Sequence, residues 1–355
     1  MRATLQLLPW LLAAFLLAAL AAAPVASHAK SQVLPKPVVF KKKPGVKSMR
    51  PRAKLRAEPL KLSFGQLSGL HAGGDELDLK SSVALVLDQD TNEVLFSKNS
   101  RAVLPIASIT KLMTALVVTE ALLPLDEILT ISAEDIDTEK GSHSRLQVGT
   151  RLSREQMLHL ALMSSENRAA NALGRHHPGG LSAFVAAMNR RAAALGMKDT
   201  HYVEPTGLSS RNQSSATDLA LLVREAGKYP LIRQHSTSIE QQVAVGSRQL
   251  QFRNTNGLVR SGEWEIGLQK TGYISEAGRC LVMQAQLSGR KLIMVLLDSA
   301  GKYSRIGDAE RIRKWLGDLP AAGPRALPSV LPTAGAPALP SAAPPIVSVA
   351  VPKLS

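Results

Sequence analysis

The sequence predicts an α+β fold, in which both ends of one domain contribute strands to an antiparallel sheet and a helical region is inserted between them. Two observations predict it. Apolar segments with the length and character of strands lie within residues 82–96 and again within residues 280–297, whereas the stretch between them repeats its apolar residues at helical spacing. Strands at both ends with helices between them are typical of an α+β domain.

Four strands are expected. Residues 82–87 form an apolar run, and a turn-like stretch leads to a hairpin partner at residues 94–96. Near the other end, residues 280–287 partly alternate between apolar and polar, and a Ser-Gly turn follows. Residues 291–297 then form a second strong apolar run. These four segments, with a further strand that starts at Lys270, would make the sheet.

The helices are expected over residues 108–122, 154–163, 181–195, 217–226 and 308–316. The first repeats apolar residues between Leu112 and Val118 at helical spacing. The second follows Ser153, and Gln156 stands three residues later, which matches a capping box. The last would close the domain with one apolar face.

The formal charge of +15 is concentrated in one segment. Residues 30–61 carry eleven basic residues and one acid, whereas residues 62–324 carry 29 basic and 27 acidic residues. The nearly neutral body argues against a basic binding face, so no nucleic-acid partner is expected. Residues 30–61 lack apolar periodicity, so we expect a disordered leader that either binds an anionic envelope surface or is a solvated spacer.

The composition also sets the remaining boundaries. Residues 1–29 combine a basic start, an apolar run and a small-residue cleavage site, which is typical of a signal peptide removed on export. Residues 62–77 are expected to be a linker, and residues 78–319 the folded domain. Residues 320–355, rich in Pro and Ala, are expected to be a flexible tail.

The first of three motifs that carry candidate chemistry is Ser108-Ile109-Thr110-Lys111 at the start of a predicted helix. The i, i+3 spacing places Ser108 and Lys111 on one helix face. A Ser hydroxyl needs a base within hydrogen-bond reach, and a Lys can serve if burial lowers its pKa. Alone the motif is weak, because Ser at a helix start is most often a cap.

The second motif, Ser165-Glu166-Asn167, follows the second predicted helix and offers a hydroxyl that could relay a proton and an amide that could bind substrate. The third, Lys270-Thr271-Gly272, is expected to start the first strand of the C-terminal sheet. There Lys and Thr could bind a carboxylate, and Gly would let a substrate backbone approach. Each is weak alone, since Ser and Asn are common in turns and strand ends are usually solvated.

Together the three motifs are specific. S-x-x-K, S-x-N and K-T-G occur in this order, separated by 57 and 105 residues, and close forms of them mark β-lactamases and penicillin-binding proteins. Over residues 78–319 the chain resembles low-molecular-mass penicillin-binding proteins of the D-alanyl-D-alanine carboxypeptidase/endopeptidase family. The runs 105–114 and 162–170 are especially similar to the endopeptidase subgroup. The resemblance implies a β-lactamase/transpeptidase-like fold and a periplasmic serine DD-peptidase.

The resemblance also implies a role for each motif residue. Ser108 would attack a D-Ala carbonyl, Lys111 would be its general base, and Ser165 would pass a proton to the leaving amine. The backbone N–H groups of Ser108 and Tyr273 would form the oxyanion hole. Asn167 would hold either the substrate or Lys111. Lys270 and Thr271 would bind the terminal carboxylate. Gly272 and Tyr273 would complete the substrate-binding residues. Peptidoglycan stem peptides would be substrates, β-lactams would acylate Ser108 as inhibitors, and no cofactor or metal is expected.

Two acidic residues need separate treatment. Glu204 lies in a Glu-Pro context 39 residues after Ser165, close to the spacing of the deacylating Glu of class A β-lactamases. The lactamase element also needs an Asn four residues later, where this chain has Leu208, so a deacylation role for Glu204 is not favoured. Glu166 replaces the Asp of the S-D-N form and is expected to be structural. Cys280, the single cysteine, is expected to be a buried strand residue.

The activity preferred from the sequence is cleavage of D-alanyl cross-links through an acyl-serine intermediate. The family's carboxypeptidases often carry a separate C-terminal β-domain and an amphipathic anchor helix, whereas only about 36 Pro-rich residues are expected to follow the last helix here, which favours the endopeptidase subgroup. A carboxypeptidase that trims stem pentapeptides, a β-lactamase and a catalytically silent wall-binding protein stay open as alternatives.

Overall fold

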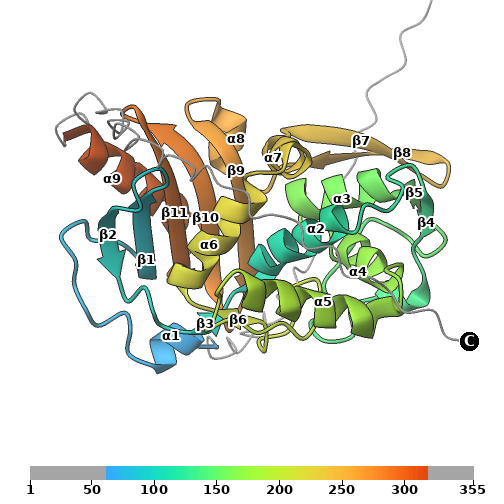
Figure 1. The fold of residues 1–355 in the computed structure, drawn as a ribbon, viewed down its shortest axis with the longest axis horizontal. Coiled ribbons are helices and arrows are strands. Elements are labelled where there is room, and N and C mark those ends of the chain that lie inside the picture. The colour runs from blue at the N-terminus through green and yellow to red at the C-terminus, as the bar shows by residue number, and fades with distance from the viewer. Residues whose placement is uncertain (1–60, 319–355) are drawn as a thin grey trace, which may run out of the picture. The chain divides into compact units, whose positions relative to one another are not determined.

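The computed structural model describes residues 61–318, and its centre is a five-stranded antiparallel sheet with the order β2-β1-β11-β10-β9 (Figure 1). Its strands are β1 (Ser81–Asp88), β2 (Val94–Lys98), β9 (Glu265–Ile274), β10 (Gly278–Leu287) and β11 (Arg290–Ser299). Strand β1 pairs with β11, with Val83 opposite Leu297, so the two ends of the domain meet in one sheet. The predicted α+β class and sheet are confirmed.

The helical region lies between β2 and β9 in the chain, as expected. Its helices are α2 (Thr110–Glu120), α3 (Arg154–Met163), α4 (Asn167–Arg175), α5 (Gly180–Ala194), α6 (Ala216–Ala226) and α7 (Pro230–Thr237). Every residue of α2 from Thr110 to Val118 is buried, because helices α3 to α7 pack around it. Ser153 caps α3 through the predicted capping box with Gln156.

The sheet separates two apolar cores. Alternate residues of β1 point to opposite faces, so Val83 and Leu85 join the core shared with the helical region, and Ala84 and Val86 join the other. Helix α9 (Ser304–Asp318) covers this second face with Ile312 and Leu316. Figure 1 shows α9 and α6 on opposite sides of the sheet. The helical side therefore places its loops next to the edge strand β9.

Shorter elements that the sequence did not predict complete the domain. They are α1 (Phe64–Leu67), β3 (Leu104–Pro105) with β6 (Gln213–Ser214), η1 (Ala107–Ile109), β4 (Ile128–Thr130) with β5 (Arg151–Ser153), η2 (Ala133–Asp135), the hairpin β7 (Glu240–Val245) and β8 (Arg248–Arg253), and α8 (Gly257–Ser261). Most are too short or too polar to produce a periodic apolar pattern.

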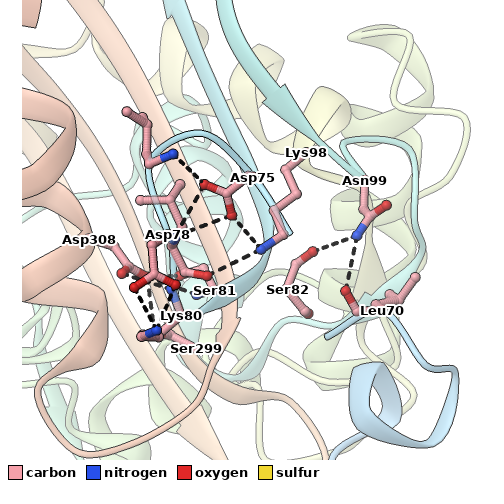
Figure 2. A network of polar contacts seen from close by, with 12 residues as sticks. Leu70, Asp75, Asp78, Lys80, Ser81, Ser82, Lys98, Asn99, Ser299 and Asp308 are labelled. Carbon is pink, nitrogen blue, oxygen red and sulfur yellow. Dashed lines mark hydrogen bonds and ion pairs between the residues drawn. The ribbon is translucent and has the colours of Figure 1, made fainter. Parts of the chain in front are cut away.

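The segment 62–77 differs from its prediction as a linker, because it packs against the domain. Helix α1 begins with a capping box at Ser63, and the Phe64 N–H donates to the Glu276 carbonyl at 2.9 Å. Figure 2 shows how the segment is held: Asp75 accepts hydrogen bonds from Lys98 and from backbone N–H groups of residues 77 and 79. The predicted signal peptide, the leader up to residue 60 and the tail from residue 320 lie outside the described residues. No helix within residues 61–318 is long and apolar enough to cross a membrane.

Candidate active site

The three motifs meet in one cleft between the helical region and strand β9. Its cavity has a volume of about 510 Å³. Six of the eight predicted site residues line it, namely Ser108, Ser165, Asn167, Thr271, Gly272 and Tyr273. The other two, Lys111 and Lys270, are fully buried beneath its floor. The two amines therefore influence a molecule in the cavity through the serine hydroxyl groups that they contact.

Lys111 is placed to act as a base toward Ser108. Its Nζ lies 2.9 Å from Ser108 Oγ, 2.7 Å from Asn167 Oδ1 and 2.6 Å from the Thr206 carbonyl oxygen. Burial lowers the pKa of Lys111 from 10.5 to about 7, although the charges of Glu204 and Glu166 raise it. A neutral amine has two N–H groups and one lone pair. Because the two carbonyl-type oxygens can only accept, they take both hydrogens, and the lone pair is left for the Ser108 hydroxyl.

Ser165 contacts the second buried lysine. Lys270 Nζ donates to Ser165 Oγ and to the Thr271 carbonyl, both at 2.9 Å. Burial holds the pKa of Lys270 well below its ordinary value, and the charges of Lys111 and Arg305 lower it further. Ser165 has φ of +62°, a left-handed conformation that costs a non-glycine residue free energy. That conformation places its hydroxyl between the amine and the cavity.

Two glycines allow the backbone of η1 to approach its neighbours. A Cβ on Gly272 would lie 3.1 Å from the Ile106 carbonyl oxygen and from the Ser108 nitrogen, and a Cβ on Gly207 would lie 1.9 Å from the Ala107 carbonyl oxygen. Gly272 was expected to make room for a substrate backbone, but the space that it leaves is occupied by η1. Because Gly272 has no side chain, the backbone of η1 can pack against it, and this packing sets the position of the Ser108 N–H.

The motif Lys270-Thr271-Gly272 lies in the middle of β9 and not at its start, which corrects the prediction. Five residues precede Lys270 in the strand, and Lys270 lies opposite Val282 of β10. Strand β9 is an edge of the sheet, and it contacts η1. An edge position leaves one side of the strand available to a substrate backbone.

The two acidic residues near the site are occupied by internal hydrogen bonds. The Glu204 carboxylate accepts from the backbone N–H groups of Thr206 and Gly207, each at 2.6 Å, and from Asn212 Nδ2 at 2.8 Å. It thus shapes the loop whose Thr206 carbonyl contacts Lys111. Glu166 accepts from Ser144 Oγ at 2.6 Å, and burial raises its pKa despite that bond. Both residues have structural positions.

The cleft contains polar residues that sequence reasoning missed. Thr255 Oγ1 lies 2.6 Å from Thr271 Oγ1, and Asn167 Nδ2 donates to Ser142 Oγ at 2.9 Å. Arg305, from the start of α9, also lines the cavity, and its buried Nε has no hydrogen-bond partner among the described residues. No motif links these residues, because the fold brings them from separate segments. Tyr273 is 55% exposed, and Arg279 lies over its ring.

Two remaining expectations concern cysteine and metals. Cys280 is buried in β10, as expected, and burial raises its pKa to about 12. Within residues 61–318 no group of three or more His, Cys, Asp or Glu side chains could hold a metal ion.

Comparison with known proteins agrees with this geometry. Residues 71–301 match the peptidase family S11, described as D-alanyl-D-alanine carboxypeptidase. The chain is 52% identical to a D-alanyl-D-alanine endopeptidase of Pseudomonas aeruginosa and 46% identical to that of Escherichia coli, each over 67% of this chain and 78% of the relative. The crystal structure of the Streptomyces K15 DD-transpeptidase superposes with a TM-score of 0.63 at 26% identity, over 68% of this chain and 98% of that one.

Proposed function

Because the chain belongs to the D-alanyl-D-alanine carboxypeptidase family of serine peptidases, we propose that it is a D-alanyl-D-alanine endopeptidase that cleaves cross-links between peptidoglycan stem peptides. One observation carries the chemistry: the buried Lys111 amine has two carbonyl-type acceptors for its hydrogens and faces Ser108 Oγ at 2.9 Å. The preference for cross-links is supported by the two endopeptidases at 52% and 46% identity.

Acylation begins with the transfer of the Ser108 hydroxyl proton to Lys111 Nζ while Oγ attacks the D-Ala carbonyl carbon. The developing oxyanion is stabilised by the backbone N–H groups of Ser108 and Tyr273. When the carbon–nitrogen bond breaks, the Ser165 hydroxyl donates its proton to the leaving amine and takes up the proton held by Lys111, so Lys111 is neutral again for the next step. Asn167 fixes both Lys111 and the substrate amide, so its side chain is shared between the two.

Water then hydrolyses the acyl-serine ester. Lys111 accepts a proton from the water, whose oxygen attacks the ester carbonyl, and the Ser108 oxygen is protonated as it leaves. A penicillin would acylate Ser108 in the same way. The Glu204 carboxylate is held by its own loop, which weighs against a β-lactamase with a dedicated deacylating Glu.

The carboxylate of the leaving residue binds at the end of the cleft near Thr271. The hydroxyl groups of Thr271 and Thr255 and the guanidinium of Arg305 face that part of the cavity. Lys270 is fully buried and its amine contacts Ser165, so in this proposal it makes no direct contact with the carboxylate. This differs from the direct carboxylate contact expected from the sequence.

A carboxypeptidase is the second candidate, because the description of the matched family names that activity. Both enzymes would use the same residues in the periplasm, after export by the segment 1–29. Digestion of purified cross-linked muropeptides separates them: an endopeptidase converts dimers to monomers, whereas a carboxypeptidase only removes terminal D-Ala from pentapeptides. Loss of terminal D-Ala with intact dimers would contradict the proposal.

The basic leader, residues 30–61, is proposed to bind an anionic envelope surface. Its excess of Lys and Arg supports this, because a segment with many positive charges and no apolar periodicity is attracted to anionic lipid headgroups or wall polymer. Deletion of residues 30–60 should weaken binding to sacculi or anionic vesicles, and the loss should shrink as salt is added. Equal binding by the full-length protein and the deletion variant would show that the leader is only a spacer.

A further inference from the structure

A cluster of charged side chains lies where the cleft meets the turn between β9 and β10. Lys140, from the loop before β5, lines the cavity, and its Nζ donates to Glu276 Oε1 at 2.7 Å. Lys61 contacts the same carboxylate oxygen. Ser275, which also lines the cavity, donates to Glu276 Oε2 at 2.9 Å. We call Lys61, Lys140 and Glu276 the 140/276 cluster.

The 140/276 cluster has one net positive charge. Burial alone would raise the pKa of Glu276, but the hydrogen bonds from Lys140 and Lys61 lower it to about 2, so the carboxylate is ionised at neutral pH. Two ammonium groups therefore face one carboxylate. An ammonium group has three N–H donors, and Glu276 is the only described hydrogen-bond partner of the Lys140 ammonium. Two donors of Lys140 remain available at the cavity wall.

The position of the 140/276 cluster along β9 indicates which part of the substrate reaches it. In the proposed reaction the leaving residue lies near Thr271, and the scissile carbonyl lies at Tyr273. The acyl side of the substrate must then run past residues 274 and 275, antiparallel to the edge strand. Strand β9 ends at Ile274 and residues 275–277 form the turn into β10, so Glu276 lies just beyond the end of the edge strand, on the acyl side of Tyr273.

We propose that the 140/276 cluster is a subsite for a carboxylate on the acyl-side stem peptide, two or three residues before the scissile bond. This inference rests on the proposed function and names the part of the substrate that the cleft recognises. Lys140 donates to the carboxylate, and Glu276 with Lys61 holds the Lys140 side chain in place. Peptidoglycan stems offer such a group on the γ-linked D-glutamate and, in some walls, on the side chain of diaminopimelate.

The test uses cross-linked peptides in which either carboxylate of the acyl-side stem, or both, is amidated. The wild-type enzyme should lose about tenfold in kcat/KM when the recognised carboxylate is amidated, because a charge-assisted hydrogen bond is lost. The amidated peptide that is cleaved more slowly identifies which carboxylate, that of D-glutamate or of diaminopimelate, binds the subsite. Lys140→Met should cleave free and amidated peptides at equal rates, and Lys140→Arg should keep the discrimination.

Lys80→Met is the matched control, because Lys80 is paired only with the exposed Asp78 and lies outside the cavity. It should discriminate as the wild type does. Comparing free with amidated substrate within each variant removes any general loss caused by a shifted loop. Equal cleavage of all peptides by the wild type, or retained discrimination in Lys140→Met, would overturn the subsite alone. Failure of the wild type to cleave any cross-linked peptide would overturn the proposed function and the subsite with it.

Discussion

Lys270 of strand β9 donates a hydrogen bond to Ser165, which lies between α3 and α4, over 2.9 Å. A second link lies beside it, since the Thr255 N–H donates to the carbonyl of Met163, the last residue of α3, over 3.1 Å. The sheet and the helical region are therefore joined at the point where the proposed proton relay stands. The position of Ser165 depends on both halves of the domain.

Replacement of Ser165 should separate catalysis from backbone strain. Both Ser165→Ala and Ser165→Gly remove the proposed proton relay, so turnover of cross-linked peptides should fall by about 10²-fold or more. Because φ at this residue is +62°, the glycine variant should be more stable than the alanine variant by about 1 kcal/mol. Urea unfolding monitored by circular dichroism measures the difference. Greater stability of the alanine variant would mean that the left-handed conformation is not strained.

The rate at which penicillin acylates Ser108 should rise as the pH increases through about 7. Lys111 accepts a proton only when it is neutral, and its pKa is lowered to about 7, so the neutral form dominates above that pH. The second-order rate constant, measured with a labelled penicillin between pH 5 and 9, should reach a plateau on the alkaline side. Lys111→Met should abolish the labelling. A midpoint near 10 would show that Lys111 is charged in the free enzyme.

The sequence predicts the fold because its main elements are long and strongly patterned. Continuous apolar runs mark β1 and β11, and a capping box marks α3. Strand β9 was placed too late because its first five residues include the polar Glu265 and Gln269 and the strand-weakening Gly267. Only its pairing with β10 defines the start. The sequence alone predicts a linker for 62–77 because the few apolar residues that pack there, Phe64, Leu70 and Leu77, have no periodic spacing, and its hydrogen bonds reach distant residues.

The site was predicted only as far as its residues fall in contiguous motifs. Each motif brought one or two polar groups whose chemistry can be read from residue type. Thr255 and Arg305 come from segments that reach the cleft only when the chain folds, so no motif spacing in the sequence predicts them. The role of Gly272 could not be read either, because its neighbour in space is the backbone of η1.

Gly207→Ala should destabilise the protein much more than an alanine at another left-handed glycine. Gly207 has φ of +82°, and an added Cβ would lie 1.9 Å from the Ala107 carbonyl oxygen. Gly149 has φ of +87° with no atom within 4 Å of an added Cβ, so Gly149→Ala measures the conformational cost alone. We expect about 1 kcal/mol for Gly149→Ala and about 3 kcal/mol for Gly207→Ala. Equal losses in urea unfolding would show that the loop yields without cost.

Glu204→Gln should weaken the loop that supports Lys111 without a specific effect on deacylation. Thr206 and Gly207 donate to different oxygens of Glu204, and glutamine keeps only one of these acceptors, so its NH2 group would face one of the two N–H donors and leave it unsatisfied, at a cost of about 1–3 kcal/mol. Acylation by penicillin should slow, because the Thr206 carbonyl that orients Lys111 is displaced. Glu263→Gln, at an exposed position, is the control.

The measurement that decides the role of Glu204 is the lifetime of the penicillin adduct. If Glu204 activated the deacylating water, its loss would leave acylation fast and make the adduct accumulate, as removal of a general base from one step requires. Because the Glu204 carboxylate is held by contacts inside one loop and Lys111 is the proposed base for both steps, formation and decay of the adduct should slow together. Rapid acylation with a longer-lived adduct in Glu204→Gln would instead assign the residue to deacylation and favour the β-lactamase alternative.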